Sequence, residues 1–292
     1  MRRPSTFPMT IADSSHSTTR VLRLRDGQRH AVDDQLAVEE PLEIRLGYTD
    51  AHKGRVHKSV AITMRTPGDD IALAMGFLHA ESIIHDIALI DSVDDTSANV
   101  LRLELHPDVR LDPIRLERHF YTTSSCGVCG KASLEALSLS GFDTIADNRF
   151  TMNESALLQL PNLLREQQSL FKLTGGNHAT ALFDASGKIA LVKEDVGRHN
   201  AMDKLVGTLL QQGRLPMHQH GILVSGRASF ELLQKALAAG CPMLVAVGAP
   251  SSLAVELAEE FDITLVGFVG KSGFNVYHGS ERILAGDGLR HG

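Results

Sequence analysis

The feature that most constrains the fold is an alternation of short apolar runs and amphipathic segments near the end of the chain. Apolar runs at residues 221–226, 241–248 and 263–270 are separated by helix-like segments at residues 228–240 and 251–262. Runs rich in Val, Leu and Ile, separated by amphipathic helices, are typical of parallel strands that are buried on both faces of a sheet. The alternation therefore predicts a parallel sheet covered by helices.

The segment before this alternation predicts two further helices and a hairpin. A helix is expected within residues 155–176, with Pro161 in its first turn and Gly175 and Gly176 as its stop. Residues 178–195 predict a hairpin that turns at Ser186 and Gly187, and residues 199–213 predict a helix with one apolar face. Together these elements form an α/β domain that we place at residues 134–292.

A smaller α+β lobe is expected at residues 37–120. Its predicted elements are strands at residues 41–50, 57–66 and 98–108 and a helix at residues 71–84. Asp69 and Asp70 follow a Thr-Pro-Gly turn and are expected to cap that helix. Between the two lobes, residues 121–133 are rich in Ser, Thr and Gly and predict a loop. The Ser/Thr-rich start of the chain predicts a disordered tail at residues 1–36.

Composition restricts the possible partners and the compartment. The net charge of −6 provides no basic field for nucleic acid or for an anionic membrane. The chain has no signal-peptide pattern and no apolar run of about 18 residues, so we expect a cytoplasmic protein without a membrane span. Three cysteines are too few for a disulfide scaffold and fit a reducing cytosol.

Three strand-to-helix or strand-to-turn junctions are suited to an anion. They lie at residues 224–229, 247–252 and 268–275, and two of them carry a cation, Arg227 and Lys271. Ligands of open α/β sheets bind beyond the carboxyl ends of the strands, where helix N-termini offer free N–H groups. A ligand that carries phosphate is therefore expected at these junctions. The Gly-Lys-Ser triplet at residues 270–272 lacks the upstream glycine of a Walker A loop.

A dense polar stretch lies at residues 194–204. Its side chains include Glu194, Asp195, Arg198, His199, Asn200, Asp203 and Lys204. An ordinary helix start, with Asn200 as cap, would explain it, and so would contact with a ligand. Asn177 and His178 present the same choice. The sequence leaves both interpretations open.

Cys126 and Cys129 form a Cys-x-x-Cys pair in the predicted loop. A structural zinc site needs four protein ligands and a catalytic site needs three, and the pair supplies two. His79-Ala80-Glu81 reads His-x-Glu as in zinc deaminases, but Ser125 stands where their proline would be, and Cys241 reads as a core residue. A thioredoxin-like pair would follow a βα unit, which is not evident here. A nucleophilic thiolate, favoured by Lys131 and a following helix, remains the third possibility.

Six ordered segments resemble the formate dehydrogenase accessory sulfurtransferase family, FdhD. They lie at residues 64–84, 124–131, 194–207, 225–236, 248–260 and 264–277. The resemblance implies a cytidine-deaminase-like αβα domain behind the smaller lobe, and a homodimer. It also implies a sulfur carrier that takes persulfide sulfur from a cysteine desulfurase. The sulfur goes to Mo-bis(molybdopterin guanine dinucleotide), bound as a substrate, for formate dehydrogenase. A non-catalytic chaperone for that cofactor is the alternative.

By position, the resemblance makes Cys126 the persulfide-bearing residue and Cys129 the assisting one, with no metal ion bound directly by the protein. The cofactor-binding segment falls on Phe268, Val269, Gly270, Lys271, Ser272 and Gly273. Ser225, Gly226 and Arg227 join it through the anion-junction argument. Family members commonly carry an arginine after the last strand, where this chain has Gly270 and Lys271. Lysine keeps the charge without the bidentate fork of a guanidinium.

Overall fold

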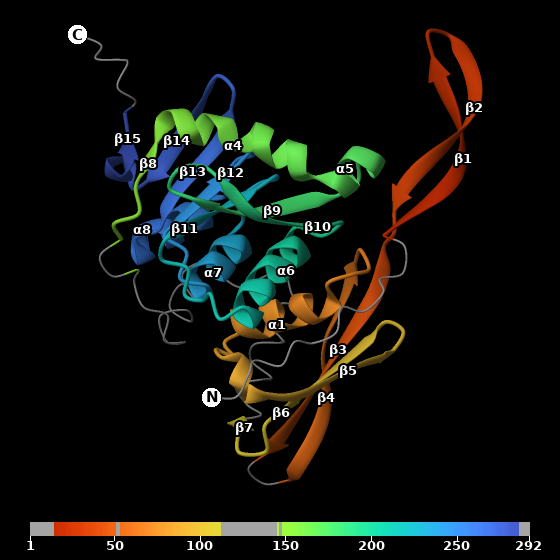
Figure 1. Cartoon of the computed structure of the whole chain (residues 1–292), viewed down its shortest axis with the longest axis vertical. Coiled ribbons are helices and arrows are strands. Elements are labelled where there is room, and N and C mark those ends of the chain that lie inside the picture. The colour runs from red at the N-terminus through yellow and green to blue at the C-terminus, as the bar shows by residue number, and fades with distance from the viewer. Residues whose placement is uncertain (1–14, 51–52, 112–144, 146–147, 286–292) are drawn as a thin grey trace.

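The computed structural model describes residues 15–50, 53–111, 145 and 148–285. These residues fold into two packed lobes and a projecting hairpin (Figure 1). The predicted loop at residues 121–133 lies outside the described ranges. No helix in the described part of the chain is long and apolar enough to cross a membrane.

The larger lobe is built on a six-stranded sheet. Its strands are β9 (His178–Asp184), β10 (Ile189–Asp195), β11 (His220–Val224), β12 (Met243–Ala246), β13 (Thr264–Gly270) and β14 (Gly273–His278), in the order β10-β9-β11-β12-β13-β14. Strands β11, β12 and β13 are parallel, as predicted. Because β9 is antiparallel to both β10 and β11, β10 runs in the same direction as β11. Four strands therefore end at one edge of the sheet.

Helices cover both faces of this sheet (Figure 1). One face carries α6 (Arg198–Gln211), α7 (Phe230–Ala238) and α8 (Ser252–Phe261), and the other carries α4 (Glu154–Gln167) and α5 (Ser169–Thr174). Leu182, Ile222 and Leu244 belong to the core beneath α6, α7 and α8. Ala181, Leu223 and Val245 belong to the core beneath α4. Neighbouring strand residues thus enter opposite cores, which explains the continuous apolar runs in the sequence.

The smaller lobe packs one helix on a second sheet. Strands β3 (Glu40–Asp50), β4 (Gly54–Arg65), β5 (Ile90–Ser97) and β6 (Val100–Leu105) lie in the order β4-β3-β6-β5, and β7 (Arg110–Leu111) pairs with β3. Helix α1 (Asp70–Ala80) follows β4. The predicted strands and helix of this lobe are confirmed. The 3-10 turns η1 (Ile87–Leu89) and η2 (Ser280–Arg282) and the short pair β8 (Met152–Asn153) with β15 (Ile283–Leu284) complete the described chain.

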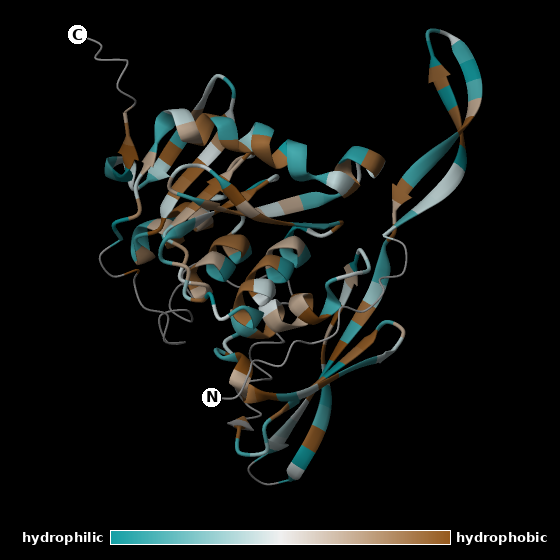
Figure 2. Cartoon of the chain, viewed as in Figure 1, coloured by the Kyte–Doolittle hydropathy of each residue, from teal (hydrophilic) through white to brown (hydrophobic). Residues whose placement is uncertain are grey.

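The two lobes meet where α1 packs against α6, and glycines allow the close approach. A Cβ atom on Gly207 would lie 1.8 Å from the carbonyl oxygen of Ala72. A Cβ atom on Gly76 would lie 1.9 Å from the carbonyl oxygen of Asp203. Neither position has room for a side chain, so the helix backbones touch. Figure 2 shows hydrophobic residues along the helices and strands of both lobes.

The prediction of a disordered tail at residues 1–36 was wrong from residue 16 onward. Residues 16–37 form the antiparallel hairpin of β1 (His16–Arg25) and β2 (Gln28–Ala37), which projects from the body (Figure 1). Both faces of the hairpin are largely exposed, so its strands contribute no residue to the buried core. The Asp26-Gly27 turn was the usable signal, because both residues have positive φ, of 50° and 74°, as a type I′ turn requires.

Two local predictions about helix ends differ from the structure. Asp69 occupies the N-cap position of α1, as predicted, but its side chain makes no capping hydrogen bond, and Asp70 instead binds the guanidinium of Arg65 through both carboxylate oxygens. Pro161 lies in the middle of α4 and not in its first turn. Its position costs α4 one backbone hydrogen bond, because proline has no N–H. The overall division at residues 37–120 and 134–292, and the likeness to the deaminase fold, stay predictions.

Buried charges lie between α1, α6 and α7. Lys235 Nζ is 2.7 Å from Asp203 Oδ1, and both side chains are buried. Glu81, just after α1, is buried near this pair, and its burial and the Asp203 carboxylate raise the pKa of Glu81 to about 7 against the effect of Lys235. His79 places its two ring nitrogens 3.1 and 2.9 Å from the carbonyl oxygens of Ile84 and Ala238. The His-x-Glu triplet thus lies between helices.

Glu81 makes stability fall as pH rises. Between pH 4.5 and about 7 the folded protein keeps a proton on Glu81 that the unfolded chain has released. Raising the pH through this window should therefore lower the free energy of unfolding, by up to about 3 kcal/mol from this group. The Glu81→Gln variant should show a flatter profile between pH 5 and 8 in urea denaturation. If the wild type and Glu81→Gln lose the same free energy of unfolding between pH 5 and 8, this assignment is contradicted.

Candidate functional site

One edge of the large sheet gathers most of the polar motifs of the second lobe. Strands β10, β11, β12 and β13 end there, and α6, α7 and α8 begin there. The three predicted anion junctions therefore lie along the same edge. The polar stretch at residues 194–204 and the start of β9 at His178 lie on it as well.

Backbone hydrogen bonds join the junctions to one another. The N–H of Gly248 donates to the carbonyl of Gly226 at 2.9 Å, and the N–H of Phe268 donates to the carbonyl of Gly248 at 3.1 Å. Gly248 leaves little room for a side chain, because a Cβ atom would lie 3.1 Å from the backbone nitrogen of Arg227. The structure thus brings Ser225, Gly226 and Arg227 close to Phe268, although some forty residues separate them in sequence.

The predicted cofactor segment is partly exposed. Phe268 is 52% exposed and adopts a left-handed φ of 54°, which is uncommon for an aromatic residue. The side chain of Val269 is buried in the core beneath α4. Lys271 and Ser272 form the exposed turn between β13 and β14, and Gly270 pairs with Gly273 across it. Arg227 is exposed at the neighbouring junction.

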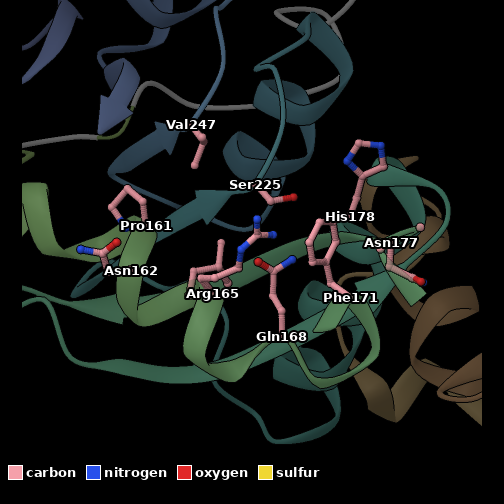
Figure 3. A pocket seen from close by; sticks show the side chains of 12 residues that line it. Pro161, Asn162, Arg165, Gln168, Phe171, Asn177, His178, Ser225 and Val247 are labelled. Carbon is pink, nitrogen blue, oxygen red and sulfur yellow. The ribbon is translucent and has the colours of Figure 1, made fainter. Parts of the chain in front are cut away.

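A pocket of about 510 Å³ opens beside these junctions (Figure 3). Strand ends supply His178, Ser225 and Val247, and the α4–α5 region supplies the opposite wall. That wall consists of Pro161, Asn162, Leu164, Arg165, Gln168, Phe171, Gly175 and Gly176, followed by Asn177. The volume lies in the range of small-molecule sites. The sequence predicted the strand-end side of this pocket and missed the α4–α5 side.

Phe171 gives the pocket an oriented aromatic ring. Its backbone N–H and that of Leu170 donate to the Glu194 carboxylate at 2.8 and 3.0 Å, which fixes the start of α5. The guanidinium of Arg165 lies over the ring, 4.2 Å from its centroid. Gln168 is only 4% exposed and lines the pocket beside this ring. Figure 3 shows Gln168 beside Arg165 and Phe171 in the pocket wall.

Cationic side chains lie next to the pocket at the start of α6. Burial and the charges of Arg198 and His199 lower the pKa of His178. The Nε atom of Arg198 is buried without a hydrogen-bond partner in the described chain. His199 Nε2 lies 3.3 Å from both Ser229 Oγ and a Glu231 carboxylate oxygen, and its hydrogen bond is the main cause that lowers the pKa of Glu231 to about 2. The guanidinium of Arg198 thus offers an N–H donor to an anion at this corner.

Asp195 and Lys204 have a structural role. Their side chains are buried and form an ion pair of 2.7 Å. Asp195 also accepts from the backbone N–H of Gly197 and from the side chain of Asn200. Asn200 lies inside α6, whose N-cap is Gly197, so it is not the cap that one of the two interpretations required. The sequence left the roles of these polar residues open. In the structure, Glu194 and Asp195 hold neighbouring segments in place through hydrogen bonds. Arg198 and His199 lie at the edge of the site.

The cysteines divide between the core and the part of the chain that is not described. Cys126 and Cys129 lie outside the described residues. Cys241 is fully buried in the core, as predicted, and burial raises the pKa of its thiol to about 12. Among the described residues, no group of three His, Cys, Asp or Glu side chains is placed to hold a metal ion.

Comparisons with known proteins place the chain among relatives that share most of its length. The sequence model of the FdhD/NarQ family matches residues 37–284. A protein of Streptomyces coelicolor named "Sulfur carrier protein FdhD" is 50% identical over 274 residues, which cover 90% of this chain and 94% of that protein. Proteins of the same name from Mycobacterium tuberculosis and Sulfurisphaera tokodaii are 45% and 40% identical, over 86% and 91% of this chain and 92% and 98% of their own lengths.

One solved structure shares the fold. It is the crystal structure of a proposed formate dehydrogenase accessory protein from Desulfotalea psychrophila. It superposes with a TM-score of 0.71 at 22% identity and covers 93% of this chain and all of that one. The mixed α/β arrangement described above is therefore the arrangement found by experiment in a distant relative.

Proposed function

The chain belongs to the FdhD/NarQ family, and we propose that it is a cytoplasmic sulfur carrier that serves formate dehydrogenase. It accepts persulfide sulfur from a cysteine desulfurase on Cys126 and transfers that sulfur to Mo-bis(molybdopterin guanine dinucleotide). The observation that carries the proposal is the 50% identity, over nine-tenths of the chain, to a relative named a sulfur carrier protein. The Cys-x-x-Cys pair supplies the sulfur chemistry that such a carrier needs.

The loading step is a thiol exchange. The Cys126 thiolate attacks the terminal sulfur of the desulfurase persulfide, a new S–S bond forms on Cys126, and the desulfurase cysteine leaves as a thiolate. This step needs no net oxidant, because one S–S bond replaces another. The thiolate is the reactive form, so a lowered pKa of Cys126 would accelerate it.

The delivery step needs two electrons, because a persulfide sulfur must become sulfide. Cys129 can supply them by attacking the inner sulfur of the Cys126 persulfide. The terminal sulfur then leaves as hydrosulfide toward molybdenum, and a Cys126–Cys129 disulfide remains. A cellular dithiol reductant returns this disulfide to two thiols. The assisting role of Cys129 follows from this balance.

The edge and the pocket support binding of the cofactor as a substrate. A guanine base can stack on Phe171 and bond to the side-chain amide of Gln168, which lines the same pocket. Phosphates can reach the guanidinium of Arg198 and the exposed Arg227 and Lys271. Phe268 exposes an aromatic face on the same edge.

A non-catalytic cofactor chaperone is the alternative, and formate dehydrogenase maturation in cells separates the two functions. In a host that lacks its own family member, Cys126→Ala should abolish formate dehydrogenase activity. Lys271→Ala should lower it by about tenfold, the loss of one charged phosphate contact. Full activity of Cys126→Ala with loss in Lys271→Ala would establish the chaperone instead. Lys53→Ala, at an exposed position in the turn before β4 of the smaller lobe, serves as the matched lysine control.

A further inference from the structure

Thr66 is a buried junction between the two lobes. It follows β4 in the smaller lobe and is 2% exposed. Its backbone N–H donates to Asp195 Oδ2 at 3.1 Å, and its carbonyl oxygen accepts from Lys204 Nζ at 2.8 Å. Its hydroxyl oxygen accepts from the Asn177 side-chain amide at 3.1 Å and from the N–H of Val196 at 3.2 Å. Every polar group of this one residue thus contacts the larger lobe.

The bond to Asn177 leads directly to the pocket. Asn177 is 5% exposed and lines the pocket beside His178, which begins β9. Its side-chain amide is fixed at both ends, because Nδ2 donates to Thr66 and Oδ1 accepts from Thr174 Oγ1 at 3.2 Å. Figure 3 shows Asn177 and His178 next to each other at one side of the pocket. Thr66 therefore holds one wall of a cavity that it does not itself line.

The bond to Val196 fixes the other side of the same corner. Val196 lies between the end of β10 and the start of α6, two residues before Arg198. Thr66 thus links the segment that carries Asn177 and His178 to the segment that carries Arg198 and His199. Its backbone groups add the buried pair of Asp195 and Lys204 to the same joint.

We infer that Thr66 is a positioning residue for ligand binding in the pocket: its hydroxyl fixes Asn177 and the start of α6 relative to each other. The inference rests on the proposed function in one respect, that the pocket binds a guanine nucleotide. When one hydrogen-bond partner of a buried amide is removed, the amide either reorients or keeps an unsatisfied polar group, which costs free energy. The smaller lobe then contributes to cofactor binding without contacting the cofactor.

Isosteric substitution tests the hydroxyl directly. Thr66→Val keeps the branched shape and removes the acceptor of both bonds, whereas Thr66→Ser keeps the acceptor. With GDP, a fragment of the proposed cofactor, as the probe in calorimetric titrations, Thr66→Val should bind about tenfold more weakly, the loss equivalent to one buried hydrogen bond. Thr66→Ser should bind as the wild type does.

Thr63 provides the matched control. Its hydroxyl donates to Asn200 Oδ1 at 3.0 Å, so Thr63→Val also breaks a bond between the lobes, but one that does not reach the pocket. We expect Thr63→Val to keep wild-type GDP affinity while thermal unfolding shows a loss of stability like that of Thr66→Val. Because Thr66 acts partly through Asn177, the double variant Thr66→Val/Asn177→Ala should lose less GDP affinity than the sum of the two single losses.

The outcomes separate the inference from the proposed function. If Thr66→Val binds GDP like the wild type, or if Thr63→Val weakens binding equally, Thr66 has no positioning role of its own. Additive losses in the double variant would also overturn the inference. A wild-type protein that binds no GDP would overturn the nucleotide part of the proposed function and the inference with it.

Discussion

The Gly207→Ala substitution is expected to lower the free energy of unfolding by about 3 kcal/mol or more. The new Cβ atom would lie 1.8 Å from the carbonyl oxygen of Ala72 and 2.7 Å from the backbone nitrogen of Gly76. Both are backbone atoms of α1 and cannot rotate away, so the two helices must separate. Alanine favours a helix by about 1 kcal/mol over glycine, which offsets only part of this cost.

Urea denaturation followed by circular dichroism measures the effect. Gly270→Ala is a suitable control, because no atom lies within 4 Å of a Cβ there and its φ lies outside the left-handed range. The control should stay within about 0.5 kcal/mol of the wild type. If Gly207→Ala also stays within that range, the α1–α6 contact is not as close as described, and the account of how the lobes join is wrong.

The large sheet could be predicted from the sequence because burial on both faces leaves a clear pattern. The runs around Ile222, Leu244 and Leu265 are continuous, since each strand serves the cores on both sides. The hairpin of β1 and β2 lacks such a pattern, because Leu22 and Leu24 are exposed and its strands have no core. There only the turn at Asp26 and Gly27 carries information.

Half of the pocket could be predicted and half could not. The strand-end side follows from a general rule about α/β sheets, so Ser225 and the neighbouring junction residues were accessible to sequence reasoning. Phe171 and Gln168 come from the α4–α5 region, whose position across the sheet edge depends on tertiary packing. The prediction that Pro161 lies in the first turn also placed the start of the helix too late, because α4 begins at Glu154 and Pro161 lies in its middle.

The polar stretch at residues 194–204 shows a second limit of sequence reasoning. Charged residues near a helix start usually face solvent, yet Asp195 and Lys204 are buried and paired. Their partner is Thr66, about 130 residues earlier in the chain. Such a long-range joint leaves no periodic signal. The only sign of it in the sequence is that many charged residues lie within one short segment.

The second large effect is expected at Cys126. The Cys126→Ala variant should accept no sulfur from a cysteine desulfurase, because alanine offers no atom that can form the persulfide bond. Cys129→Ala should still load one sulfur and should fail in delivery, since the electrons for release of sulfide would be missing. Cys241→Ala should load normally, because that thiol is fully buried in the core.

The rate of sulfur loading is also predicted to depend on pH. The attacking group is the Cys126 thiolate, so the loading rate should rise with pH until that thiol is fully ionised. Alkylation with iodoacetamide before loading should block the reaction.

The most direct test of the sulfur-carrier function is the intact mass of the protein after incubation with a cysteine desulfurase and free cysteine. Wild type, Cys129→Ala and Cys241→Ala should each gain the mass of one sulfur atom, and dithiothreitol should remove it. Cys126→Ala should gain none. A reducible sulfur on Cys126→Ala, at the level of the wild type, would contradict the assignment of Cys126 as the carrier residue.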